Sequence, residues 1–226
     1  MANTKKVILL IFEGPSDRDA LFFPFENKFL LNDVRVEITY GDITSDRDSD
    51  SSNIKEKVCE IVDRFLDESK LHPEDIKEVI QITDTDGCYI ENDLIIEQSD
   101  CPTAWYTEDA IFTGKVSAIQ KRNENKSMNL NVLSSCKKIK NIDYSLYFMS
   151  SSLDHVLFGK LNLSDEEKES LSNAFARKYR ADHNGFIKFI TKSDFSICDS
   201  YENSWEMIKL DNNSLRKFTN LSILFL

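Results

Sequence analysis

Long apolar runs are missing from this chain of 226 residues. A helix that crosses a membrane needs about 20 consecutive apolar residues, and the N-terminal run Val7–Phe12 is ended at once by Glu13. The same run is shorter than the apolar part of a secretory signal, which spans roughly 7–15 residues. The sequence therefore predicts a cytoplasmic protein that does not bind a membrane.

Cysteines are few and widely spaced. The chain has five, at Cys59, Cys88, Cys101, Cys136 and Cys198, and none of them forms a C-x-x-C pair. An odd, scattered set argues against a disulfide framework and against a structural zinc site. We expect free thiols that are mostly buried.

Charge is spread unevenly along a chain whose net charge is −11. Residues 1–113 carry 11 Lys and Arg against 26 Asp and Glu, a net charge of −15, whereas residues 114–226 carry 17 against 13, a net charge of +4. The negative total argues against a nucleic-acid partner. The segment 115–140, however, has seven basic residues against Glu124 alone. It is either a phosphate-binding surface or a Lys-rich loop in solvent.

We expect Lys121, Arg122 and Lys126 to be exposed, and six basic side chains in this segment are the candidate contacts to nucleic acid. They are Lys115, Lys121, Arg122, Lys126, Lys137 and Lys138. The neighbouring pair Trp105 and Tyr106 either stacks on bases or anchors a loop to the core.

Four segments have the composition of strands. Val7–Phe12 is continuously apolar and rich in β-branched residues, as in a strand buried on both faces. Val34–Thr39 alternates with a period of two, and Val79–Thr83 and Tyr144–Met149 are short apolar runs. The segment Ile54–Leu66 repeats apolar residues at helical spacing. Strands that alternate with helices predict βαβ units around a mostly parallel sheet.

The expected fold class is therefore α/β, with a Rossmann-like, mostly parallel sheet of about four strands. Residues 1–160 would form this domain, with residues 88–140 as an inserted basic segment that contains one short helix. Residues 161–226 would form a helical C-terminal part packed on it. The final run Leu221–Leu226 is too apolar for a free tail. We expect it to dock on the core, on a second copy of the chain or on a partner protein.

Acidic residues follow the predicted strands where ligands gather in parallel α/β sheets. Glu13 follows the first strand, and Asp84 and Asp86 follow the third; Asp154 and His155 come just after the fourth. Clustered carboxylates repel one another, and a divalent cation removes that repulsion. Mg²⁺ prefers one or two carboxylates together with waters and a substrate phosphate. The pattern predicts a Mg²⁺ site, with Mn²⁺ as a substitute. Ordinary turns and acidic helix N-termini are the alternative.

These residues together resemble a TOPRIM domain, the module of topoisomerases, primases and small nucleases. The resemblance rests on the first strand with Glu13-Gly14, on the helix that opens at Ser16-Asp17, and on the third strand with Asp84-Thr85-Asp86; it covers about half of the chain. It implies that Glu13 acts as a general acid or base or as a metal ligand, and that Asp84 and Asp86 bind Mg²⁺, with Asp84 at the catalytic centre. The Glu13–Asp17 turn is most similar to stand-alone TOPRIM-like proteins of bacterial anti-phage defence and mobile-element loci.

The resemblance has departures that narrow the activity. The chain has no zinc ribbon, no helicase motif and no G-x-x-x-x-G-K-[ST] motif, and no tyrosine nucleophile accompanies the domain. Topoisomerase and full primase activities are therefore not expected. The favoured function is Mg²⁺-dependent phosphodiester chemistry on nucleic acid, as in a nuclease.

Two other functions stay open. One is a TOPRIM-like module that binds nucleic acid or a partner protein without catalysis. The other is a phosphatase, because Ile80–Gly87 also resembles the nucleophile motif of haloacid dehalogenases, in which the first aspartate is phosphorylated. Against the phosphatase, Cys88 replaces the usual Thr or Val, and no downstream Asp-Asp pair supplies the remaining metal ligands.

Overall fold

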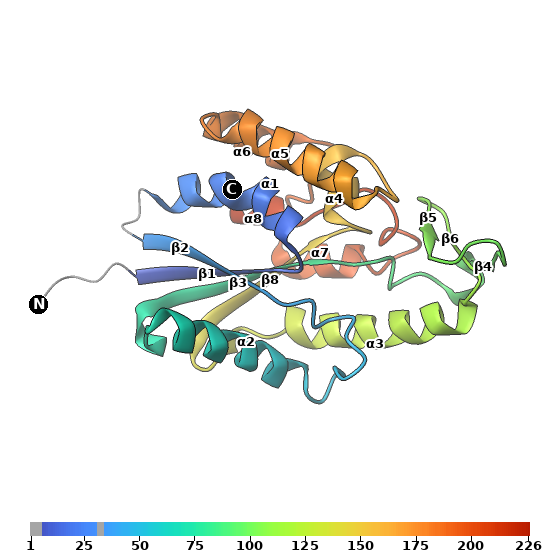
Figure 1. Cartoon of the computed structure of the whole chain (residues 1–226), viewed down its shortest axis with the longest axis horizontal. Coiled ribbons are helices and arrows are strands. Elements are labelled where there is room, and N and C mark those ends of the chain that lie inside the picture. The colour runs from blue at the N-terminus through green and yellow to red at the C-terminus, as the bar shows by residue number, and fades with distance from the viewer. Residues whose placement is uncertain (1–5, 31–33) are drawn as a thin grey trace, which may run out of the picture. The chain divides into compact units, whose positions relative to one another are not determined.

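The computed structural model describes residues 6–30 and 34–226 (Figure 1). Its α-helices are α1 (Pro15–Leu30), α2 (Ile54–Ser69), α3 (Val116–Ser134), α4 (Leu153–Phe158), α5 (Asp165–Tyr179), α6 (His183–Lys192), α7 (Tyr201–Met207) and α8 (Leu221–Leu224). Its strands are β1 (Lys6–Phe12), β2 (Val34–Tyr40), β3 (Ile76–Asp84), β4 (Ile95–Glu97), β5 (Trp105–Tyr106), β6 (Ile111–Thr113), β7 (Lys138–Ile139) and β8 (Ile142–Met149). Two short 3₁₀ helices span Pro73–Asp75 and Asn92–Leu94.

The chain forms two compact units, each assembled from three stretches of sequence. Unit 1 contains residues 1–83, 129–147 and 169–186, and unit 2 contains residues 84–128, 148–168 and 187–226. The units therefore do not follow one another along the chain, in contrast to the division at residue 160 that the sequence suggested.

A five-stranded sheet in the order β2-β1-β3-β8-β7 organises unit 1. β1 pairs in parallel with β2 and with β3, and β7 pairs antiparallel with β8, so the sheet is mixed but mostly parallel. All four predicted strands are present, and each is extended by one or more residues. The α/β class with a mostly parallel sheet is confirmed.

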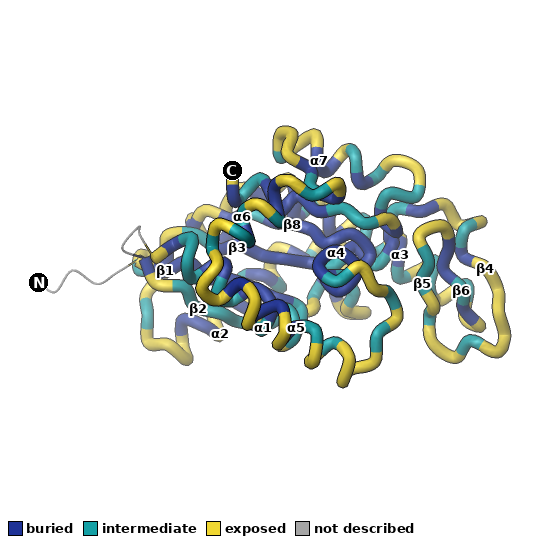
Figure 2. The backbone as a smooth tube through the Cα atoms, turned by 90° about the horizontal axis from the view of Figure 1, so that it is seen from above, coloured by how far each residue is buried: buried dark blue, intermediate teal, exposed yellow. Residues whose placement is uncertain are grey.

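Helices cover both faces of this sheet, with α1 on one face and α2 on the other (Figure 1). α2 buries the apolar stripe that its sequence predicts, including Ile54, Val58 and Val62. Residues Val7–Phe12 are completely buried, as expected for a strand with helices on both faces (Figure 2). Pro24 lies inside α1, which runs on past it to Leu30.

Residues 88–140 contain more regular structure than their sequence indicated. The expectation of one short helix in residues 88–140 is wrong, because this segment holds a three-stranded sheet in the order β4-β6-β5 and the 19-residue helix α3. The small sheet contributes Ile95 and Ile111 to a compact apolar cluster that also includes Leu215. Strands of two or three residues carry too little periodicity to be recognised in a sequence.

The C-terminal run docks on unit 2, as the first of its predicted alternatives requires. Leu221 is fully buried and Phe225 nearly so, whereas the terminal Leu226 is exposed. Nearby, the Asn220 side-chain oxygen accepts a hydrogen bond of 2.8 Å from the backbone N–H of Phe148 in β8. Within residues 6–30 and 34–226, no helix has the length and apolar content that a membrane crossing requires.

Candidate functional site at the end of strand β3

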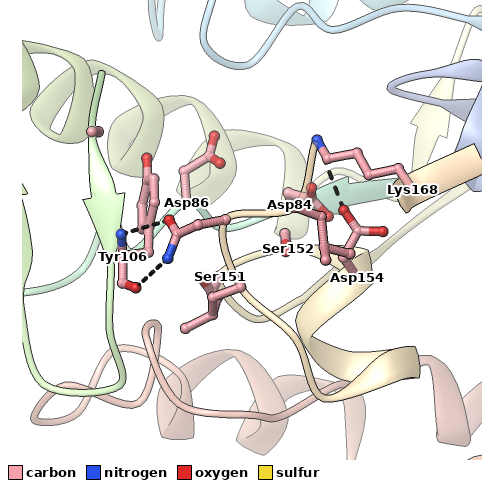
Figure 3. A pocket seen from close by; sticks show the side chains of 11 residues that line it. Asp84, Asp86, Tyr106, Ser151, Ser152, Asp154 and Lys168 are labelled. Carbon is pink, nitrogen blue, oxygen red and sulfur yellow. Dashed lines mark hydrogen bonds and ion pairs between the residues drawn. The ribbon is translucent and has the colours of Figure 1, made fainter. Parts of the chain in front are cut away.

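A cavity of about 210 Å³ opens in unit 2 where β3 ends (Figure 3). Its lining is rich in charged and polar side chains: Asp84, Asp86, Ala104, Tyr106, Ser151, Ser152, Asp154, Leu161, Asn162, Leu163 and Lys168. Three of the four acidic residues proposed as metal ligands from the sequence therefore line one cavity. In Figure 3, Asp84, Asp154 and Lys168 lie together on one side, and Asp86 and Tyr106 lie on the other.

Asp84 is held at the first turn of α4. Its Oδ1 accepts a hydrogen bond of 2.8 Å from the backbone N–H of Leu153, the first residue of that helix. The preceding residue, Ser152, is the N-cap, and its hydroxyl accepts a hydrogen bond from the N–H of His155. These bonds fix the direction of the Asp84 carboxylate at the pocket wall.

Two backbone segments lock together beneath the pocket. The N–H of Asp86 donates to the carbonyl of Ser151 at 2.9 Å, and the N–H of Ser151 donates to the hydroxyl of Thr85 at 2.8 Å. Asp86 and Ser151 have φ angles of 49° and 59°, in the left-handed region that non-glycine residues rarely adopt. Such conformations persist where the surroundings enforce them, and they cluster at functional sites.

Gly87 continues this left-handed turn with a φ of 66°. A Cβ at this position would lie 2.5 Å from the side chain of Leu215, so the turn also needs the small size of glycine. Gly87 therefore lets the backbone turn away after the two aspartates.

Asp86 is neutralised by a buried lysine. The Nζ of Lys126 lies 2.5 Å from Asp86 Oδ2, and the Lys126 side chain is completely buried while that of Asp86 is 29% exposed. The expectation that Lys126 is exposed and contacts nucleic acid is therefore wrong. An ammonium group is buried only when it is paired, and the carboxylate of Asp86 supplies that pairing.

Arg122 extends this network from the previous turn of α3. Its guanidinium donates to the carbonyl oxygen of Asp86 at 2.8 Å and to the hydroxyl of Tyr106 at 2.5 Å. Burial raises the pKa of the Tyr106 hydroxyl, so this group stays protonated. Arg122 is only partly accessible and holds the β3 turn, so it is not the exposed contact that the sequence suggested.

The other side of the pocket holds a looser ion pair. Lys168 Nζ lies 3.8 Å from Asp154 Oδ2, and the side chains are 40% and 11% exposed. Burial raises the pKa of Asp154, and Lys168 acts in the opposite direction. Asp154 is thus a buried carboxylate whose charge a cation in the pocket would stabilise.

The side chain of His155 lies outside the pocket. It does not line the cavity, and its Nε2 lies 3.2 Å from Glu108 Oε1. The ring is 4% exposed, and burial lowers its pKa. The neighbour Asp154 reaches the pocket, whereas His155 joins α4 to the loop after β5.

Glu13 belongs to unit 1, at the end of β1. The hydroxyl of Thr83, the last residue before Asp84, donates a hydrogen bond of 2.6 Å to Glu13 Oε1. The parallel register of β1 and β3, in which Ile11 pairs with Gln81, brings these two strand ends side by side. The catalytic role of Glu13 stays a prediction.

The remaining basic candidates are exposed. Lys115 and Lys121 lie at the start of α3 in unit 2, and Lys137 and Lys138 precede β8 in unit 1. Lys138 Nζ is 3.3 Å from Asp143, an exposed pair of little energetic weight. Their role in binding nucleic acid is untested.

The donor set of the pocket fits a single hard cation. Among the described residues, no three His, Cys, Asp or Glu side chains already form a metal cluster. Two carboxylates with waters are nevertheless enough for Mg²⁺, and Asp84 and Asp154 line the pocket together. The buried carboxylate of Asp154, whose pKa is raised, would gain from such a charge.

Comparisons with protein-family models, with curated proteins and with solved structures found no match to this chain. The residues of the pocket therefore carry the functional argument.

Sequence reasoning missed Lys168 altogether and gave Lys126, Arg122 and Tyr106 a role other than the one they have at this site. One available signal was the spacing of Arg122 and Lys126, which are four residues apart and therefore share a face if the segment is helical. No local pattern connects Lys168 to Asp154, because that contact depends on how α5 follows α4.

Proposed function

We propose that this protein performs Mg²⁺-dependent phosphodiester chemistry on nucleic acid at a TOPRIM-like site. The observation that carries the proposal is the pocket at the end of β3, where Asp84 and Asp154 lie beside Lys168 (Figure 3). Carboxylates that hold a hard cation, next to a lysine that can bind a phosphate, are the groups that phosphoryl transfer requires. The Asp-x-Asp turn and its resemblance to TOPRIM proteins support the same function.

Asp84 and Asp154 would hold the metal, which when bound polarises a phosphoryl oxygen and orients the substrate. Lys168 would exchange its contact with Asp154 for a substrate phosphate, since the 3.8 Å pair is loose and partly exposed. Asp86 acts as a positioning residue, because its carboxylate binds Lys126 and its carbonyl binds Arg122.

Glu13 is our candidate for proton transfer. The hydrogen bond from Thr83 fixes the orientation of its carboxylate, which a general base needs. Exposed Lys115 and Lys121 are the candidates for contacts to the phosphate backbone.

The phosphatase alternative is weakened by the Asp86–Lys126 pair. In the motif that Ile80–Gly87 resembles, the second aspartate donates a proton to the leaving group. A lysine 2.5 Å from Asp86 favours the ionised carboxylate, which has no proton to donate. A non-catalytic module that binds nucleic acid remains the second candidate.

The test is turnover of a single-stranded DNA, an RNA and p-nitrophenyl phosphate, each with and without Mg²⁺. We expect cleavage of an oligonucleotide that Asp84→Asn reduces at least 100-fold. Asp93→Asn is the matched control, because Asp93 is an exposed aspartate outside the pocket. Turnover of the phosphomonoester alone would contradict the proposal. Binding of an oligonucleotide without cleavage would favour the non-catalytic module.

A further inference from the structure

A second groove in unit 2 lies on the opposite face of the small sheet from the acidic pocket. Its volume is about 520 Å³, and its lining is Gln98, Asp100, Cys101, Pro102, Thr103, Trp105, Thr107 and Phe112. None of these residues lines the first cavity. Successive side chains of a strand point to opposite faces, so in β5 Trp105 faces this groove and Tyr106 faces the pocket at β3.

Trp105 is the most distinctive residue of the groove. Its side chain is 53% exposed, and it lies across from Phe112 in the antiparallel pair of β5 and β6. The outer strands of this sheet are mainly accessible to solvent (Figure 2). An exposed tryptophan beside a second aromatic ring is the kind of anchor that dominates binding surfaces.

The segment that forms this groove carries only negative charge. Residues 88–114 contain no Lys or Arg and six acidic residues, all of them exposed: Glu91, Asp93, Glu97, Asp100, Glu108 and Asp109. Such a surface repels a phosphate backbone and attracts cations. The ring of Trp105 has the same preference, because its π face attracts ammonium and guanidinium groups.

We propose that the groove binds a Lys or Arg side chain from a basic peptide segment of a partner protein. The cation lies over the Trp105 ring, and the Asp100 carboxylate at the rim of the groove pairs with it. This binding is independent of the chemistry proposed for the pocket at β3.

The groove would recognise a side chain of the partner, and the partner would not add a strand to the edge of the small sheet. At the free edge of β5, the Asn162 side chain already makes two hydrogen bonds of 2.8 Å with the backbone N–H and carbonyl of Tyr106. That edge is therefore closed to a further strand at this point, while the face that carries Trp105 stays accessible.

Tryptophan fluorescence can report binding in this groove, because only one of the two tryptophans of the chain is accessible to ligands. Trp105 is half exposed and Trp205 is 3% exposed, so ligands in solution reach only Trp105. We would titrate the full chain with the acetylated, amidated tetrapeptide Gly-Arg-Arg-Gly and follow tryptophan emission. We expect a saturable change in emission. The affinity for the peptide should be at least 3-fold lower in the Asp100→Asn variant, and the change in emission should be absent in Trp105→Phe. Raising the salt concentration should weaken binding further.

Four controls decide whether the proposal holds. Asp194→Asn removes an exposed aspartate outside the acidic segment and should bind the peptide like the wild type. Thermal melts of every variant show whether it is folded; a folded Asp100→Asn protein with unchanged affinity would overturn the role of charge. The proposal also fails if the peptide causes no saturable change, if Gly-Asn-Asn-Gly binds equally well, or if a single-stranded oligonucleotide binds the groove more tightly.

Discussion

Two aspartate–lysine pairs line or support the same cavity, and they differ in almost every physical respect. Asp86 and Lys126 are 2.5 Å apart, with a lysine that is completely buried, whereas Asp154 and Lys168 are 3.8 Å apart, with a lysine that is 40% exposed. Lys126 lies on α3, whose Arg122 holds the same turn, and Lys168 lies near the start of α5. Desolvation is the cost of the first pair, and solvent screening weakens the second.

The difference between the two ion pairs suggests two roles, one structural and one in the proposed ligand binding. A buried lysine cannot leave its carboxylate without stranding a charge, so the Asp86–Lys126 pair fixes the Asp-x-Asp turn. The Lys168 side chain is 40% exposed and can move at little cost, so this is the pair that the proposed Mg²⁺ or phosphate would displace. The segment 115–140 makes the same point for the basic residues, since Lys126 and Arg122 build the site and Lys115 and Lys121 stay on the surface.

The largest expected effect is on stability, when each pair is broken from its lysine side. Lys126→Met should lower the free energy of unfolding by about 3 kcal/mol, the low end for a broken buried pair, because Asp86 keeps some access to water. Lys168→Met should lower it by less than about 1 kcal/mol. Urea unfolding of both variants measures the difference. Equal losses would erase the distinction between the pairs.

Metal binding should depend on the loose side of the pocket. If the pocket holds the proposed Mg²⁺, a single site at a concentration near 100 times Kd would add about 2.7 kcal/mol to the stability of the wild type. Asp84→Asn and Asp154→Asn should each remove most of this gain, because each takes away a proposed ligand. Thermal melts with and without Mg²⁺ measure it, with Asp93→Asn as the control. A Mg²⁺ response that is unchanged in both pocket variants would place the ion elsewhere.

A smaller effect concerns pH and Asp154. Burial raises its pKa in the native state above the ordinary value of 3.8, so the native state binds this proton more tightly than the unfolded chain. That contribution to stability is complete below pH 3.8 and is lost as the pH rises through the native pKa. Asp154→Asn has no charge to bury. Without Mg²⁺ it should therefore melt higher than the wild type at pH 7.

The excess melting temperature of Asp154→Asn should shrink toward acidic pH. Lys168 opposes the raised pKa, so Lys168→Met should raise the pKa of Asp154 further and widen the pH range of the effect. Melting curves from pH 3.5 to pH 7.5 follow both changes. A constant difference across this range would show that Asp154 does not titrate as its burial requires.

The sheet and part of the site could be predicted because their signals are local. The strands of unit 1 are continuous apolar or alternating runs, and the acidic residues at their ends follow from strand direction. The buried face of α3 could not be predicted, since three of its buried residues, Asn123, Lys126 and Asn129, are polar and spaced by three. A prediction from hydrophobic periodicity assigns such a polar helix face to solvent. Only the partners, which come from distant parts of the chain, explain why these side chains are inside.

The smallest effect is on thiol reactivity, and it tests how tightly the Asp86–Lys126 side is closed. Burial raises the pKa of Cys88, which follows Gly87, to about 12, so almost no thiolate exists at pH 8. Cys101 is partly accessible in the groove of Trp105, and Cys198 is exposed. Ellman's reagent should therefore label Cys101 and Cys198 within minutes and Cys88 only after unfolding, because the thiolate is the reacting species. Peptide mapping of the labelled protein identifies each site.

Lys126→Met should loosen the turn and speed the labelling of Cys88 by about tenfold, while Lys168→Met should leave it unchanged. Labelling of Cys88 at the rate of Cys101 in the wild type would mean that the turn opens readily, and the contrast between the two pairs would then be lost.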